Sequence, residues 1–238
     1  MEAENLETQW INDQITDLEL VQPRYIQLGQ VLTEVLGRIT KQVAPASFVQ
    51  ARAKAIPSFA EKIQRKRSSY TRAVQDMTDL CGVRIITQTM PQVAAVNDLI
   101  ETYFEIDWEN SQNVIERLKP NEFGYTSMHY IVSLKRGVFP NELVDVEIPE
   151  EVYPDAEHPM KAEIQVRTLF EHAWADILHD LTYKSAFPVP QKWQREAARV
   201  AATLGTASQQ IEEIIDGLSV YAANYGQIMS HSEVEKEI

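Results

Sequence analysis

The segment between positions 161 and 167 constrains the fold of this 238-residue chain more than any other. Polar and aliphatic side chains alternate there: the polar set is Lys161, Glu163, Gln165 and Arg167, and the aliphatic set is Ala162, Ile164 and Val166. A period of two predicts a strand with one polar and one apolar face. Because a core strand does not tolerate a polar face without partners, this face belongs either to a wet edge strand or to a site that takes a metal ion or activates a hydroxyl group.

The remaining pattern places strands in the middle of the chain and helices at both ends. Apolar spacing and proline positions predict helices over 3–20, from Pro23, from Pro57, over 91–104, over 168–182 and over 191–230. Strands are predicted over 48–55, 80–87, 106–117, 125–135 and 161–167, with a loop rich in proline and acids over 137–160. The fold class is therefore α/β (α+β).

Composition excludes several classes of protein. The net charge of −13 argues against a general nucleic-acid binder. The single cysteine, Cys81, cannot form an intrachain disulfide or a cysteine-rich zinc site. No apolar run approaches the ~18 residues that span a bilayer, and the acidic N-terminus lacks the pattern of a signal peptide. We therefore expect a cytoplasmic protein that does not contact membranes.

A basic island interrupts this acidic chain. Positions 51–72 hold seven basic residues and one acid, a net charge of +6. The basic residues are Arg52, Lys54, Lys62, Arg65, Lys66, Arg67 and Arg72. Such a run is either a solvated helix face or the binding site of a compact anion such as a nucleotide triphosphate.

Asp79 directly precedes the apolar run 80–87, and Arg84 lies within that run. A carboxylate at the end of a strand can hold Mg²⁺, which prefers oxygen ligands and keeps several waters. The alternative is a turn aspartate with a salt-bridged arginine. The sequence alone leaves both readings open.

Two further segments carry polar groups. In the segment 119–129, lysine supplies a mobile charge, Gly124 permits close approach of the backbone, and Tyr125 and His129 share a strand face. An ordinary hairpin is the alternative. In the segment 171–180, four side chains fall on one helical face: His172, Asp176, His179 and Asp180. Hydrogen bonding to neighbouring elements explains that face better than a dedicated metal site does.

Together these segments resemble the synthetase domain of RelA/SpoT-type alarmone synthetases, from about Val49 to Lys184. The resemblance rests on four ordered motifs: Arg-x-Lys-x-x-x-Ser-x-x-x-Lys at 52–62, Asp-Leu-x-Gly-x-Arg-Ile at 79–85, Gly-Tyr-x-Ser-x-His at 124–129, and Glu-Ile-Gln-Val-Arg-Thr with a following His-Ala-Trp at 163–174. The length and the flanking helices are similar to those of the small, stand-alone members.

The resemblance implies a fold and a reaction. The fold is a mixed central sheet flanked by helices, similar to nucleotidyltransferases, with residues 45–188 as the synthetase domain and 1–44 and 189–238 as helical extensions. The reaction is transfer of pyrophosphate from ATP to the ribose 3′-hydroxyl of GTP or GDP, which yields pppGpp or ppGpp. Mg²⁺ is the implied cofactor.

The resemblance also implies roles for single residues. Asp79 and Glu163 would be the catalytic, metal-binding pair, and Glu163 would also orient or deprotonate the 3′-hydroxyl. The residues implied to bind ATP are Arg52, Lys54, Ser58, Lys62 and Arg65 at the phosphates and Arg84 at adenine. Those implied to bind the guanine nucleotide are Lys119, Asn121, Tyr125, His129 and Gln165, with Arg167 and His172 in support.

The chain departs from the long bifunctional members in two ways. Glu122 and Phe123 intervene before Gly124, where those members run Lys-Pro-Asn-Gly-Tyr. His179-Asp180 is the only His-Asp pair, so we expect no alarmone hydrolysis.

One rival function is a toxic-branch enzyme acting on adenine nucleotides or the tRNA 3′ end. The six acids and one base in residues 1–24 argue against a tRNA acceptor. The other is a silent nucleotide-binding module, which would lack the two acids. The apolar C-terminal stretch packs either on its own domain, which is the commoner outcome, or on a second copy, and the small family members imply a homo-oligomer through such helices.

Overall fold

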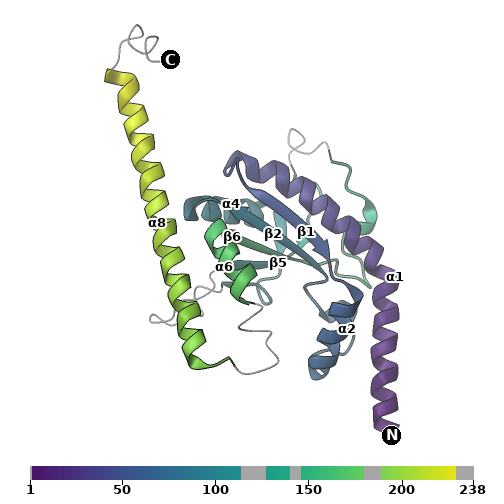
Figure 1. Ribbon diagram of the computed structural model, residues 1–238. Coiled ribbons are helices and arrows are strands. Elements are labelled where there is room, and N and C mark those ends of the chain that lie inside the picture. The colour runs from purple at the N-terminus through teal and green to yellow at the C-terminus, as the bar shows by residue number, and fades with distance from the viewer. Residues whose placement is uncertain (1, 114–126, 140–145, 180–188, 229–238) are drawn as a thin grey trace. The chain divides into compact units, whose positions relative to one another are not determined.

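The computed structural model describes residues 2–113, 127–139, 146–179 and 189–228 (Figure 1). These residues fall into two compact units. The first contains the described residues up to 113 and those from 127 to 169, and the second contains the described residues from Phe170 onward. The N-terminal helix thus belongs to the same unit as the sheet, and the three-segment division stays a prediction.

Six strands among the described residues form one mixed sheet. Their order is β1 (Phe48–Ala53), β2 (Cys81–Thr87), β6 (Ala162–Thr168), β5 (Met128–Leu134) and β3 (Phe104–Ile106), and β4 (Gln112–Asn113) also pairs with β5. β2 and β6 run parallel, and the other paired strands run antiparallel. The predicted mixed sheet flanked by helices is confirmed, and the polar-faced strand β6 is central rather than at an edge.

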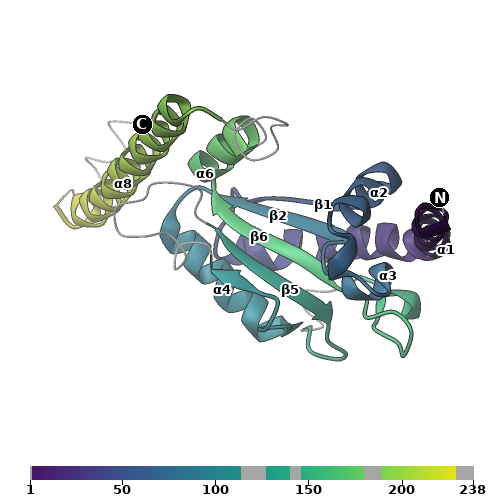
Figure 2. The same cartoon turned by 90° about the horizontal axis from the view of Figure 1, so that it is seen from below.

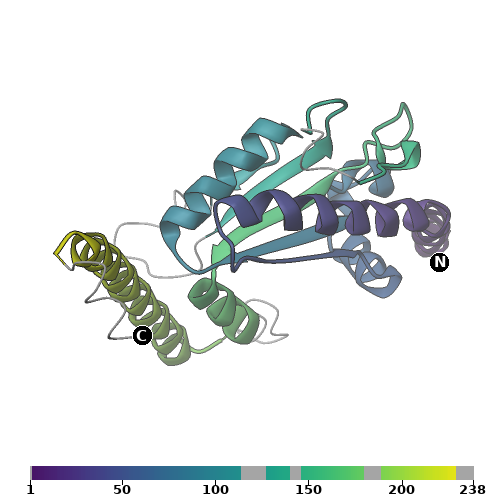
Figure 3. The same cartoon turned by 90° about the horizontal axis from the view of Figure 1, so that it is seen from above.

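Two helices cover one face of this sheet. α1 (Glu2–Ile39) packs on β1 and β2, and α4 (Met90–Tyr103) packs on β2, β3 and β6. Both lie across the same face in Figure 3, whereas Figure 2 looks at the opposite face. The buried core between them includes Leu28, Leu32, Val35, Val83, Ile85, Val96, Ile164 and Val166. The apolar face of β6 is thereby covered, which leaves its polar face on the other side of the sheet.

The prediction that Pro23 opens a second helix is wrong, because α1 continues through it. Proline removes one backbone hydrogen bond and bends a helix without necessarily ending it. Figure 1 shows such a bend part-way along α1. Burial of Leu18, Tyr25 and Leu28 on both sides of the proline holds the two halves against the core, so packing outweighs the local cost.

The prediction of one strand over 106–117 is also wrong. β3 ends at Ile106, and Asp107 then forms a turn in which its carboxylate accepts hydrogen bonds from the backbone N–H and side chain of Asn110. The Ser111 hydroxyl donates to the Asp107 carbonyl, and the short β4 follows. An aspartate that bonds to the backbone ahead of it favours a turn over a strand, and this accounts for the break.

Shorter elements complete the fold. α2 (Ile56–Arg65) has Pro57 in its first turn, as predicted, and is followed by α3 (Ala73–Asp76). Single 3₁₀ turns span Thr40–Gln42, Arg67–Ser69 and Glu150–Val152. α6 (Leu169–Trp174) leads into a π-helical turn, Ala175–His179, and α8 spans Gln191–Ile228. No helix in the described part of the chain is long and apolar enough to cross a membrane.

Candidate functional site

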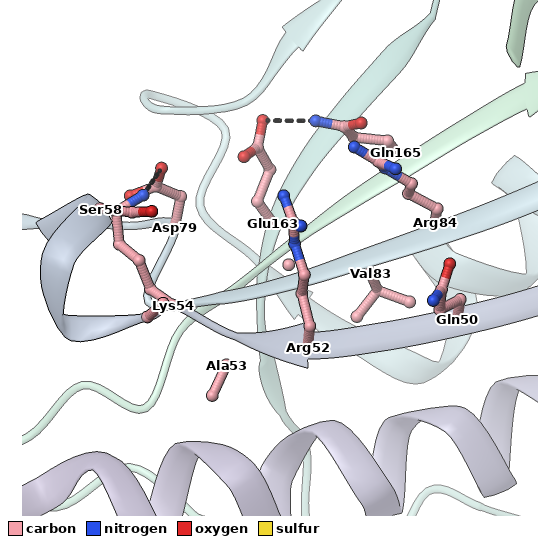
Figure 4. A pocket seen from close by; sticks show the side chains of 12 residues that line it. Gln50, Arg52, Ala53, Lys54, Ser58, Asp79, Val83, Arg84, Glu163 and Gln165 are labelled. Carbon is pink, nitrogen blue, oxygen red and sulfur yellow. Dashed lines mark hydrogen bonds and ion pairs between the residues drawn. The ribbon is translucent and has the colours of Figure 1, made fainter. Parts of the chain in front are cut away.

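Strand register places five predicted site residues, together with Gln50 and Gly82, in two rows on the sheet face opposite α1 and α4. One row runs Arg52, Gly82, Glu163 across β1, β2 and β6, and the next runs Gln50, Arg84, Gln165, His129 across β1, β2, β6 and β5. A pocket of about 250 Å³ lies over these rows. Figure 4 shows Arg52, Arg84 and Glu163 rising from neighbouring strands on the same side of the sheet.

Asp79 and two lysines form one end of the pocket. Lys54 follows β1, Lys62 lies on α2, and their Nζ atoms lie 2.9 Å and 2.8 Å from the same Asp79 oxygen, Oδ2. Burial alone would raise the pKa of Asp79, but the charges and hydrogen bonds of Lys62 and Lys54 outweigh burial and hold that pKa below its ordinary value. The carboxylate is therefore ionised at neutral pH.

Glu163 stands opposite this end of the pocket. Its Oε1 lies 2.7 Å from Nδ1 of His129 on β5, and Gln165 Nε2 donates to the same oxygen at 3.4 Å. Burial raises the pKa of Glu163 and the nearby Asp79 charge raises it further, but the hydrogen bond and charge of His129 bring it below the ordinary value. Two ionised carboxylates thus lie near one another in one pocket.

Two residues of this face were missed by sequence reasoning. Gln50 alternates with Arg52 on β1 and lines the pocket beside Arg84. Gly82 lies between Arg52 and Glu163, and no heavy atom lies within 4 Å of the place where a Cβ would stand. The period of two along β1 could have revealed Gln50, because it puts positions 50 and 52 on one face. The absence of a side chain at Gly82 gives a ligand room to approach the sheet.

The donor set fits a divalent cation of the Mg²⁺ type. Asp79 Oδ1 is buried and has no hydrogen-bond partner, so it is an unsatisfied acceptor of the kind that a metal ion would satisfy. Mg²⁺ is commonly held by one or two carboxylates together with substrate phosphates, which matches two acids beside a cluster of cations. Within the described ranges, no group of three or more His, Cys, Asp or Glu side chains could hold a metal ion by itself.

The structure brings together most of the predicted donor-side residues. Arg52, Lys54, Ser58 and Arg84 line the pocket, and Lys62 reaches Asp79. Arg65, the last residue of α2, does not belong to the pocket lining; it is exposed, and its nearest charged partner is Glu61 at 3.9 Å.

The predicted acceptor-side residues are described only in part. Gln165 lines the pocket and His129 contacts Glu163, whereas Lys119, Asn121 and Tyr125 lie outside the described residues. Of the supporting residues, Arg167 is buried on β6 with 3% of its surface exposed. His172 lies on α6 in the second unit.

Comparison with known proteins identifies the family. The model of the region found in RelA/SpoT proteins matches residues 51–187, more than half of the chain. The chain belongs to the RelA/SpoT family. The matched residues include both carboxylates and the cations of the pocket, and the family implies a divalent metal in general.

Individual relatives point to the same class of enzyme. The GTP pyrophosphokinase YjbM of Bacillus subtilis is 28% identical over 171 residues, which cover 72% of each chain. The GTP pyrophosphokinase YwaC of the same organism is 27% identical over 177 residues, which cover 72% of this chain and 76% of the relative. The crystal structure of small alarmone synthetase 1 from B. subtilis superimposes with a TM-score of 0.64 at 25% identity, covering 85% of this chain and 98% of that one. This RelA/SpoT-family chain is an enzyme of the alarmone synthetase class.

Proposed function

We propose that this chain transfers the pyrophosphoryl group of ATP to the ribose 3′-hydroxyl of GTP or GDP, in the cytoplasm and with Mg²⁺. The observation that carries the proposal is that two ionised carboxylates lie in one pocket beside cations from β1, α2 and β2. The relatives named GTP pyrophosphokinases support it, as does a structure of small alarmone synthetase 1 bound to its product pppGpp.

The cations bind the donor. Arg52, Lys54, Ser58 and Lys62 take the phosphates of ATP, with Arg65 at the outer end, and the planar Arg84 side chain stacks on adenine. The guanine nucleotide lies toward β5 and β6. Its ribose and phosphates face His129 and Gln165, while Lys119 and Asn121 complete the phosphate contacts and Tyr125 stacks on guanine. In this family-based assignment, Arg167 and His172 support the site without touching the reacting atoms.

Glu163 orients the 3′-hydroxyl and accepts its proton. The hydroxyl oxygen attacks the β-phosphorus of ATP, the bond from that phosphorus to the oxygen it shares with the α-phosphorus breaks, and AMP leaves. His129 holds the carboxylate in place and stabilises its ionised form. Asp79 and Glu163 would hold Mg²⁺, which supplies neutralisation of phosphate charge. Most of the catalysis is therefore positioning and charge stabilisation.

The test is an assay with γ-labelled ATP and, separately, GTP, GDP, AMP, ATP and deacylated tRNA. Labelled pppGpp or ppGpp is the expected product. Label in an adenine nucleotide or in tRNA would move the chain to the toxic branch, and ATP binding without any transfer would favour a silent module. Adding purified labelled product back to the enzyme tests the expectation that the chain does not hydrolyse alarmone.

Substitution of the two acids tests the site assignment. Glu163→Gln and Asp79→Asn should each lower kcat by at least about 100-fold, the scale of losing a charge-stabilising group. Glu105→Gln is the matched control, because Glu105 lies exposed on β3 outside the pocket lining. Near-normal turnover in either site variant would remove the assignment.

The homo-oligomer that we propose forms through α8. Large apolar side chains are exposed there at spacings of three and four residues: Ile211, Ile214, Leu218 and Tyr221. The first half of the helix is basic (Lys192, Arg195, Arg199) and the second half is acidic (Glu212, Glu213, Asp216). Antiparallel pairing of two copies covers the apolar stripe and sets opposite charges against each other.

Light scattering on the purified protein measures the oligomer directly. Leu218→Glu should reduce the molar mass, because it places a charge in a stripe where Leu218 is 61% exposed. Gln209→Glu, at an exposed polar position of the same helix, is the control. An unchanged mass with lowered thermal stability would instead mean that the stripe packs on its own chain.

A further inference from the structure

The two oxygens of Asp79 differ in their surroundings, and neither is open to a metal ion, which limits what the pocket can bind first. One of its oxygens, Oδ2, accepts hydrogen bonds from the ammonium groups of both Lys54 and Lys62. The other oxygen, Oδ1, is covered from solvent and has no hydrogen-bond partner. A metal ion that binds at Oδ2 must displace the two lysines.

The local charge acts in the same direction. One carboxylate with two ammonium groups carries a net charge of +1, which repels a divalent cation. The second carboxylate, Glu163, is already hydrogen-bonded to His129 and Gln165. Because the described residues contain no larger cluster of metal ligands, the ligand-free pocket is a poor site for free Mg²⁺.

A triphosphate changes this balance. Its several negative charges compete with Asp79 for the lysines, and a lysine ammonium sits on a flexible four-carbon stem that can swing to a new partner. The phosphates also bring oxygen ligands that the protein itself lacks. Binding of the nucleotide therefore frees Asp79 and adds metal ligands in one step.

We propose that Lys54 and Lys62 hold Asp79 closed to divalent metal ions until nucleotide phosphates draw them away, so that metal and donor nucleotide bind cooperatively. The inference rests on the proposed function for the identity of the donor as ATP. The lysines block the binding of a metal ion to Asp79, and Asp79 blocks the binding of phosphate to the lysines. Removal of either partner should therefore raise affinity for the ligand of the other, a gain of binding that a merely structural ion pair does not predict.

The metal arm uses Mn²⁺ as a paramagnetic probe, with free Mn²⁺ measured by electron spin resonance in the absence of nucleotide. Lys62→Met should bind Mn²⁺ about tenfold more tightly than the natural protein, within the usual range of coupling between sites. Lys54→Met should shift the affinity in the same direction, so the test survives if one variant folds poorly. Lys66→Met is the matched control, because it removes the same charge one helical turn beyond Lys62 without a contact to Asp79.

The nucleotide arm uses an ATP analogue with a carbon bridge between the α- and β-phosphates, measured by calorimetry in excess chelator. Asp79→Asn should bind this metal-free analogue about fivefold more tightly than the natural protein, because its lysines are released. Glu105→Gln should bind it unchanged. The proposal is overturned if both lysine variants bind Mn²⁺ like the natural protein, or if Asp79→Asn binds the metal-free analogue no better.

Neither arm depends on turnover. If the labelled-ATP assay yields no guanine product while both gains of binding appear, the proposed function fails and the competition at Asp79 stands. If guanine product forms while both gains of binding are absent, the proposed function stands and the competition at Asp79 fails.

Discussion

Gly82 lies in the floor of the pocket, between Arg52 on β1 and Glu163 on β6. A methyl group added there meets no neighbour within 4 Å, so Gly82→Ala should leave the free energy of unfolding unchanged within about 0.5 kcal/mol. The same methyl group projects into the space over the sheet that a ligand would use. We therefore expect kcat/KM to fall by about 10- to 100-fold, the cost of displacing a substrate by about 1 Å.

Steady-state kinetics together with urea unfolding separates the two effects of that substitution. Gly137→Ala is the contrasting variant, because Gly137 has a φ of +68° in a turn, where a side chain is strained. That variant should lose stability and keep activity. Normal kinetics in Gly82→Ala would show that substrate stays clear of this part of the floor.

At the residue scale, the alternation within each strand was enough to predict which side chains share a face. Glu163 and Gln165 were expected on one face of β6, and the structure places both in the pocket. The contacts of Asp79 with Lys54 and Lys62 were not predictable, because they join positions 17 and 25 residues apart through a turn and a helix. Local periodicity carries no information about such distances.

At the scale of elements, α1 contacts β1 and β2 at Gly29. A Cβ at this position would stand 3.7 Å from both Ala51 Cβ and Cys81 Sγ, an ordinary van der Waals distance. Gly29→Ala should therefore stabilise the protein by about 0.5–1 kcal/mol, because glycine in a helix interior is costly. Gly37→Ala, in the same helix with no neighbour within 4 Å, should gain a similar amount from helix propensity alone. Urea unfolding of both variants and of the natural protein measures each change in the free energy of unfolding.

The first residue of β2 should be chemically inert. Cys81 is fully buried, and burial raises the pKa of its thiol to about 12. Because the thiolate is the reactive form, an aromatic disulfide reagent at pH 8 should modify the folded protein far more slowly than the unfolded protein. Fast modification of the folded protein would mean that β2 and α1 separate readily.

The two missed element boundaries have different causes. Pro23 was misjudged because a local rule was applied without the tertiary packing that keeps α1 together. The strand over 106–117 was misjudged because the local turn chemistry of Asp107 was overlooked. The first turn of α2 at Pro57 was placed correctly, since proline at that position fits the helix by local geometry alone.

At the scale of the whole molecule, acid should destabilise the fold before it neutralises every carboxylate. The folded-state pKa values of Asp79, Glu163 and Asp155 lie below their ordinary values, so below about pH 4.5 the unfolded chain binds more protons than the folded one. Their contribution is complete above that pH and is lost as the pH falls through the folded pKa values. The urea midpoint should be flat from pH 7 to 5.5 and fall steeply below pH 4.5.

The control for that profile is Asp155→Asn. Backbone N–H groups of His158 and Glu157 and the Arg24 side chain lower the pKa of Asp155, so its removal should flatten the acid limb and lower the midpoint at pH 7. A profile that stays flat to pH 3 would contradict the assignment of these three groups. The isoelectric point near 4.9 lies between pH 5.5 and 4.5. In that range the net charge is too small for electrostatic repulsion to keep the molecules apart.

The place of β6 in the sheet has a consequence for how the protein is made. β6 is the last strand of the described chain to be synthesised, yet it lies between β2 and β5 in the middle of the sheet. Until residue 168 has left the ribosome, β2 and β5 each present an unpaired edge, and the sheet exists as two halves. Glu163 and Gln165 lie on β6, the strand that joins the two halves of the sheet. During synthesis, the enzyme therefore gains Glu163 and closes the open edges of β2 and β5 in the same event.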